Sequence, residues 1–77
     1  MEDDNESWTN RIIVKCYSGH KYPQEPQALW WRNREWKVKE IARAWLEPGK
    51  AYFQVLADEG ATFLIWYDES QDSWFMK

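Results

Sequence analysis

The sequence predicts an all-β or mainly β protein, folded as a single small meander barrel or half-barrel of about five to six antiparallel strands. Short stretches rich in β-branched and aromatic residues recur along the chain, and turn residues separate them. The length of 77 residues leaves room for one core only. A barrel is favoured over an open sheet because closure removes unpaired strand edges.

The chain divides into a short acidic start and one domain. Residues 1–9 contain four acidic side chains and few apolar ones before Trp8. We therefore expect this N-terminus to be disordered and residues 10–77 to form the single β domain.

The domain begins with RIIVKCY (11–17), a strand candidate whose consecutive β-branched residues suit a buried, pleated surface. The next stretch, SGHKYPQEP (18–26), contains Gly19, Pro23 and Pro26. These residues exclude regular structure and predict a surface loop.

LWWRNREWKV (29–38) predicts a β-hairpin with Asn33-Arg34 as its two-residue turn. This register places Trp31 opposite Trp36 and Leu29 opposite Val38, so that these side chains share the core face. The opposite face then carries Trp30, Arg32, Lys37 and Lys39.

VKEIARAWLEPG (38–49) allows two structures. Apolar residues at helical spacing, followed by Pro48-Gly49, favour a short helix around 40–46. A strand needs a bulge near Lys39–Ile41 to keep both Val38 and Ile41 inside. We favour the bulged strand because most of the large residues here are strand-preferring types.

Three further strands are predicted at KAYFQVLA (50–57), ATFLIWYD (61–68) and DSWFM (72–76). Asp58-Glu59-Gly60 suits a three-residue loop, a type I turn with Gly60 in the left-handed conformation. The resulting register sets Val55 opposite Phe63 and Phe53 opposite Ile65 on one face. The other face receives Tyr52, Gln54, Leu56, Leu64 and Trp66.

Charge and cysteine content limit the class of protein. The net charge is −3, with acidic ends and a basic middle at 11–47, which argues against a strong non-specific nucleic-acid binder. The single cysteine excludes an intrachain disulfide and favours a reducing compartment. The acidic start lacks the pattern of a signal peptide, and FLIWY, the longest apolar run, is too short to cross a membrane. We expect a soluble, cytoplasmic protein without membrane partners.

A resemblance covers most of residues 11–75. It rests on CYSG (16–19), on W-R-x-x-x-W-x-V-x-x-I from Trp31 to Ile41, and on EPG (47–49). On these residues the chain resembles a family of short, uncharacterised prokaryotic all-β proteins. The resemblance implies a β fold, and the family has no established activity that it would imply for this chain.

Catalytic and metal sites are not supported by the residue pattern. Cys16 and His20 are four residues apart, but one Cys and one His fall short of the three or four ligands of a zinc site. Alternation with Val14 predicts a buried Cys16 thiol. The acidic pairs Asp58-Glu59 and Asp68-Glu69 fall in predicted turns, and no glycine-rich phosphate loop occurs. We expect no catalytic residue, cofactor or metal.

Several large rings are left over once one core is filled. The candidate ligand or partner face comprises Trp30, Arg32, Lys37, Lys39, Tyr52 and Trp66. One explanation is structural: barrel closure or the termini cover the rings, and Arg32 and Lys37 lie over Trp30. A second is a protein-partner or self-association face. A third is single-stranded nucleic acid stacking on the rings while the basic side chains meet phosphates.

The sequence therefore predicts a small non-enzymatic binding or accessory module that acts through a protein-partner face. The alternative is a small barrel that binds single-stranded nucleic acid around Trp30. A Cys/His-dependent enzyme or metal site is the third hypothesis.

Overall fold

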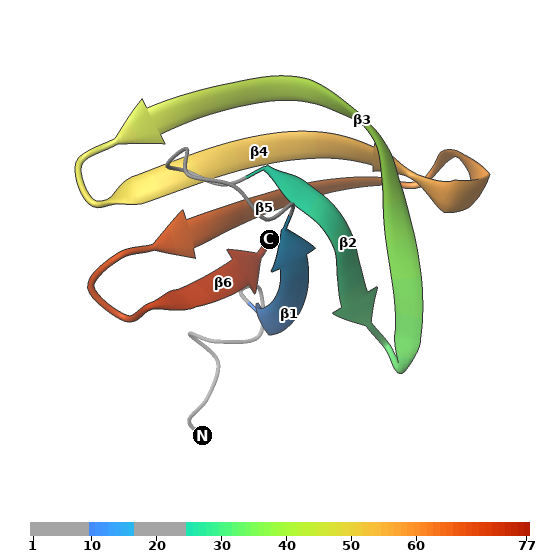
Figure 1. Cartoon of the computed structure of the whole chain (residues 1–77), viewed down its shortest axis with the longest axis horizontal. Helices are drawn as coiled ribbons and strands as arrows, with labels where there is room; N and C mark the ends of the chain where they lie inside the picture. The colour runs from blue at the N-terminus through green and yellow to red at the C-terminus, as the bar shows by residue number, and fades with distance from the viewer. Residues whose placement is uncertain (1–9, 17–24) are drawn as a thin grey trace.

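A computed structural model describes residues 10–16 and 25–77 (Figure 1). Each of its strands pairs antiparallel with the next, and the last returns to the first, which closes a six-stranded barrel. The predicted all-β barrel is therefore confirmed. The strands are β1 (Asn10–Cys16), β2 (Pro26–Trp31), β3 (Arg34–Glu47), β4 (Lys50–Ala57), β5 (Thr62–Asp68) and β6 (Ser73–Met76).

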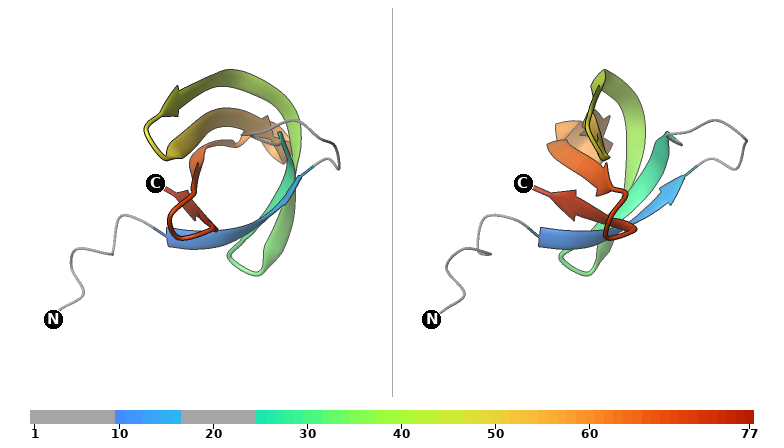
Figure 2. Two further views of the ribbon diagram at one scale, coloured as in Figure 1. Left: turned by 60° about the vertical axis from the view of Figure 1, so that its left-hand side comes forward. Right: turned by 90° about the vertical axis from the view of Figure 1, so that its left-hand side faces the viewer.

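Two sequence-based expectations lie outside the described residues. These are the disordered N-terminus over 1–9 and most of the loop over 18–26. The end of that loop is described, and there the expectation was wrong, because Pro26 is buried and begins β2. Proline is tolerated at the first position of a strand, where it need not donate to the ladder. Figure 2 shows the barrel from two further sides.

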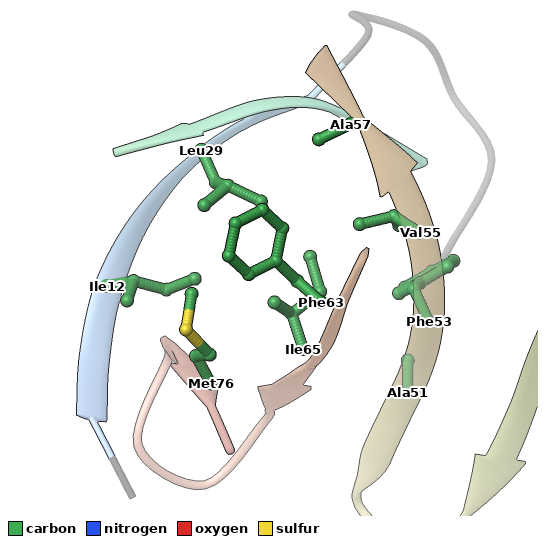
Figure 3. Packing of buried hydrophobic residues seen from close by; sticks show 9 residues of the cluster. All are labelled: Ile12, Leu29, Ala51, Phe53, Val55, Ala57, Phe63, Ile65 and Met76. Carbon is green, nitrogen blue, oxygen red and sulfur yellow. The ribbon is translucent and has the colours of Figure 1, made fainter. Parts of the chain in front are cut away.

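The core is formed by alternate residues that point into the barrel from β1, β2, β4, β5 and β6 (Figure 3). Val55 pairs with Phe63 and Phe53 with Ile65, as predicted. The buried cluster comprises Ile12, Leu29, Ala51, Phe53, Val55, Ala57, Phe63, Ile65 and Met76. Alternation thus leaves a continuous set of outward positions on the same strands.

The turn of the β2–β3 hairpin is one residue earlier than predicted. Arg32 and Asn33 form it, with φ of 55° and 61°. Two consecutive left-handed residues make the kind of turn whose twist matches a hairpin. Trp31 consequently pairs with Arg34 rather than Trp36. The register differs by two residues, so the paired residues of the two strands keep their predicted faces.

β3 is a bulged strand, and the helical alternative for 40–46 is wrong. Its register against β4 shifts between Val38 and Glu40, near the predicted bulge, and again between Ile41 and Arg43. The two bulges keep Val38 and Ile41 packed against the core while the strand bends around the barrel.

The β4–β5 turn differs from the predicted type I turn. Gly60 has the expected left-handed conformation at φ 76°, but Glu59 is also left-handed, at φ 62°. β3 contacts both acidic side chains of this turn. The Lys37 N–H donates to Asp58 Oδ2 at 3.1 Å, and Arg34 Nη2 lies 3.0 Å from Glu59 Oε2. These tertiary contacts lie outside the local sequence from which the turn was predicted.

Candidate binding face

The structure separates the six predicted face residues into different places. Trp30 lies on the outer surface of β2, whereas Tyr52 and Trp66 lie on the outer surface of β4 and β5. Arg32 belongs to the β2–β3 turn, and Lys37 and Lys39 lie on β3. They do not form one site.

Tyr52 and Trp66 belong to a row of four aromatic residues that crosses β3 to β6, Trp45, Tyr52, Trp66 and Phe75, here called the outer ladder. Successive ring centroids are 5.2, 5.5 and 6.0 Å apart, and the rings are stacked. Cross-strand pairing produces this row, because each residue is the direct partner of the next. The second bulge of β3 sets Trp45 into the same row.

The outer ladder leaves little ring surface for a ligand. Tyr52 lies between two rings, and so does Trp66, so that both faces of each are used within the protein. The Arg43 guanidinium lies 5.4 Å from the ring centroid of Trp45, the end ring. Nucleobases stack on free ring faces. The middle of the ladder is therefore a stabilising element in which Tyr52 and Trp66 stack on their neighbours.

A second aromatic group, Trp31, Trp36 and Phe63, occupies the region beside the β2–β3 turn. Its ring centroids are 5.3 to 6.3 Å apart. Arginines cover two of the rings: Arg32 lies 4.5 Å from the centroid of Trp31, and Arg34 lies 3.8 Å from that of Trp36. The expectation that Arg32 covers Trp30 was therefore wrong. The earlier turn brings Arg32 beside its neighbour Trp31 instead.

Trp30 differs from every other described aromatic residue. Among residues 10–16 and 25–77, it alone has no contact with another ring or with an arginine. It is also exposed, at 37% of its surface. Its cross-strand partner on β1 is Ile13, which is 70% exposed. Together they form an apolar pair on the surface, where large apolar groups mark interaction sites when they adjoin.

Charged side chains surround this pair. On β1, Arg11 and Lys15 lie two residues before and after Ile13 on the same outer side. On β3, Glu35 is the partner of Trp30, and Lys37 lies two residues further along on the same outer side. We define the Trp30 face as Arg11, Ile13, Lys15, Ala28, Trp30, Glu35 and Lys37. Three basic residues against one acidic give the face a charge of +2, on a chain of net −3.

Next to Trp30 along β2, three strands contribute to the face around Ala28. Ala28 on β2 is flanked by Lys15 on one side and by Lys37 on the other. It is only 2% exposed, although strand alternation sets it on the outer side. Both lysines are exposed. Lys39 has no partner on β4, because it lies at the first bulge, and it is not part of the face.

The described surroundings of Cys16 do not activate its thiol. It is half-buried at the end of β1, and burial raises the pKa of its thiol above the ordinary 9.0. The reactive thiolate is therefore disfavoured. His20, its proposed partner, lies outside the described residues. Within the described ranges, no three His, Cys, Asp or Glu side chains group as metal ligands would.

Ile13, Lys15 and Arg11 were missed as site residues by sequence reasoning. Alternation along β1, with Ile12 buried, was a signal that Ile13 points outward. The pairing of Ile13 with Trp30 could not be predicted in the same way. Nine residues separate β1 from β2 in the sequence, and a connection of that length does not fix a register.

Neither the scan of family models nor the searches of curated proteins and of solved structures found a match for this chain. The resemblance to the uncharacterised prokaryotic family stays a prediction. In the part of the chain that the structure describes, no helix has the length and apolar character needed to cross a bilayer.

Proposed function

We propose that this protein is a non-enzymatic, cytoplasmic binding module that docks a protein partner on the Trp30 face. The observation that carries the proposal is the exposed ring of Trp30, which has no ring or arginine partner among the described residues and lies beside the exposed Ile13. Aromatic residues with an adjacent aliphatic group and a charged rim are typical of the centre of a protein interface. The single cysteine, which suits a reducing compartment, supports the location.

The charge of the face indicates the chemistry of the partner. Arg11, Lys15 and Lys37 outnumber Glu35, so an acidic segment is favoured over a basic one. Arg11 Nη2 donates to Ser73 Oγ at 2.6 Å, which holds this guanidinium toward β6. The fitting partner is thus an acidic protein segment with an apolar side chain that covers Trp30.

The experiment uses the full chain and two synthetic peptides that alternate leucine with aspartate or with lysine. The leucine–aspartate peptide is expected to shift Trp30 fluorescence and the backbone amides of Ile13 and Lys37. Binding should weaken at high salt, because exposed charges are screened. Trp30→Ser should abolish binding, and Lys15→Glu should weaken it. Equal binding of both peptides, or no binding of either at about 1 mM, would contradict the proposal.

A second candidate is binding of single-stranded nucleic acid, which the same basic rim favours. One free ring is a weak basis for it, since base-stacking proteins present several rings in succession. A short oligothymidylate added at low salt tests this candidate. Tryptophan quenching that Trp30→Ser removes would support it. No change at about 1 mM would exclude it, because non-specific binding is typically tighter than about 0.1 mM.

A further inference from the structure

One long edge of β3 has no partner strand among the described residues. β2 pairs with β3 only from Arg34 to Lys37, and β4 covers the opposite edge from Val38 to Glu47. In Figure 1, the C-terminal half of β3 runs along the rim of the molecule with no strand beyond it. Such an edge presents backbone N–H and C=O groups for pairing with another strand.

The last five residues of β3 are the regular part of this edge. Both bulges precede Arg43, and from there to Glu47 the register against β4 is unbroken. Glu47 and Lys50 flank the two-residue Pro48-Gly49 turn, and the pair that closes such a turn is hydrogen-bonded. Hydrogen-bonded pairs alternate along a ladder. The backbone groups of Ala44 and Leu46 therefore point away from β4, toward the open edge.

The side chains here are apolar on one side and charged on the other. Leu46 is opposite the buried Ala51, on the inner side of the sheet, yet 65% of its surface is exposed. The end of the β3–β4 hairpin therefore projects beyond the hydrophobic core. Arg43 and Glu47, both exposed, flank Trp45 on the outer side.

We infer that this edge pairs with the same edge of a second copy of the chain, antiparallel and centred on Trp45. Ala44 then pairs with the second copy's Leu46 through their open backbone groups, and each Leu46 side chain gains an apolar neighbour. Arg43 lies opposite the second copy's Glu47, and by symmetry this ion pair forms twice. The sequence of this edge is thus complementary to itself.

The two neighbouring registers that also use the open backbone groups do not place opposite charges across from each other. Pairing Ala44 with the second copy's Ala44 sets Arg43 opposite Trp45, and pairing Leu46 with Leu46 sets Glu47 opposite Trp45. Only the register centred on Trp45 uses the open backbone groups and joins opposite charges. This register also sets Trp45, the end ring of the outer ladder, next to Trp45 of the second copy. The surface is separate from the Trp30 face, so this inference does not depend on the proposed function.

Sedimentation equilibrium of the full chain tests the inference. The 9.4 kDa chain is expected to approach twice its mass as concentration rises to about 1 mM, since a small interface gives weak association. Arg43→Glu and Glu47→Arg should each lower the association constant at least about tenfold, because two attractive pairs become repulsive. Mixing these two variants should restore a dimer, because every cross-copy pair is then attractive.

Proline provides an independent variant. Ala44→Pro removes an N–H that does not bond to β4, so the monomer should keep its circular dichroism while the dimer is lost. Ala44→Ser, which keeps the N–H, is the matched control and should dimerise. A monomer at every concentration would overturn the inference. A dimer that survives both Ala44→Pro and the single charge variants would overturn it as well.

Discussion

Asp68 is a buried carboxylate at the end of β5, and polar contacts within its own turn keep it charged. It is 7% exposed, and its oxygens accept hydrogen bonds from Ser70 N (2.9 Å), Ser70 Oγ (2.8 Å) and Gln71 Nε2 (3.2 Å). The Ser70 hydroxyl is the largest cause of a pKa lowered from the ordinary 3.8, and burial opposes it. A side chain that bonds to the backbone two residues on is typical of turns. Asp68 therefore orders the β5–β6 connection.

Asp68→Asn is expected to lower the free energy of unfolding at neutral pH. It should also make that free energy fall less steeply as the pH is lowered. The folded pKa is lowered, so the unfolded chain binds the proton first, and the contribution of Asp68 is present above pH 3.8 and lost as pH falls through the folded pKa. Urea midpoints from neutral pH down to about pH 2 measure this. Glu40→Gln, at an exposed position of β3, is the control. Equal acid dependence in Asp68→Asn and the parent would refute the assignment.

At the scale of elements, the β2–β3 hairpin depends on two consecutive left-handed residues. Arg32 and Asn33 have φ of 55° and 61°, a region that costs most residues about 1–2 kcal/mol and that asparagine tolerates. The turn also sets the position of Arg32 over Trp31 and begins the strand that carries Lys37. The conformation of this turn therefore influences where the β3 residues of the Trp30 face lie.

Asn33→Val is expected to lower the free energy of unfolding by about 1–2 kcal/mol, because a β-branched residue is strained at positive φ. Asn33→Gly is the matched comparison and should change it by less than about 1 kcal/mol, because glycine adopts this conformation freely. Chemical denaturation of both variants provides the measurement. If valine and glycine had the same effect, the turn would not be strained at this position.

The accuracy of the sequence-based predictions differed from one element to another. The β4–β5 register was predicted because Gly60 fixes the loop and alternation fixes the faces. The β2–β3 faces were also predicted, although the turn was not, because a register error of two residues preserves alternation. The correct turn depends on neighbours distant in sequence, such as the Glu59 that binds Arg34.

The candidate site was predicted only in part for a related reason. The outward positions of Trp30 and Lys37 were predicted because strand alternation alone brings them to the surface. Ile13 was not found, because its place beside Trp30 depends on barrel closure through β1. The stacking of Tyr52 and Trp66 in one row with Trp45 was not predicted, because the sequence does not reveal that the second bulge brings Trp45 into their row.

At the scale of the whole molecule, the aromatic residues explain how so short a chain sustains a closed barrel. A domain of this size buries a modest fraction of its surface, and large side chains compensate. The outer ladder joins β3, β4, β5 and β6, while Trp31, Trp36 and Phe63 join β2, β3 and β5. These contacts are distributed around the barrel, so we expect it to unfold as one unit.

Trp66→Ala is therefore expected to lower the free energy of unfolding much more than Trp30→Ser. Trp66 contacts a ring on each side, and its removal should lower the free energy of unfolding by about 2–4 kcal/mol, a large part of the roughly 4–12 kcal/mol typical of this length. Trp30 has no ring partner among the described residues, so Trp30→Ser should lower the free energy of unfolding by less than about 1 kcal/mol. Urea unfolding followed by circular dichroism and by fluorescence measures both variants. Coincident transitions with a larger loss for Trp66→Ala would separate the stabilising rings from the binding one, whereas equal losses would show that Trp30 is a structural residue and would remove the basis of the proposed face.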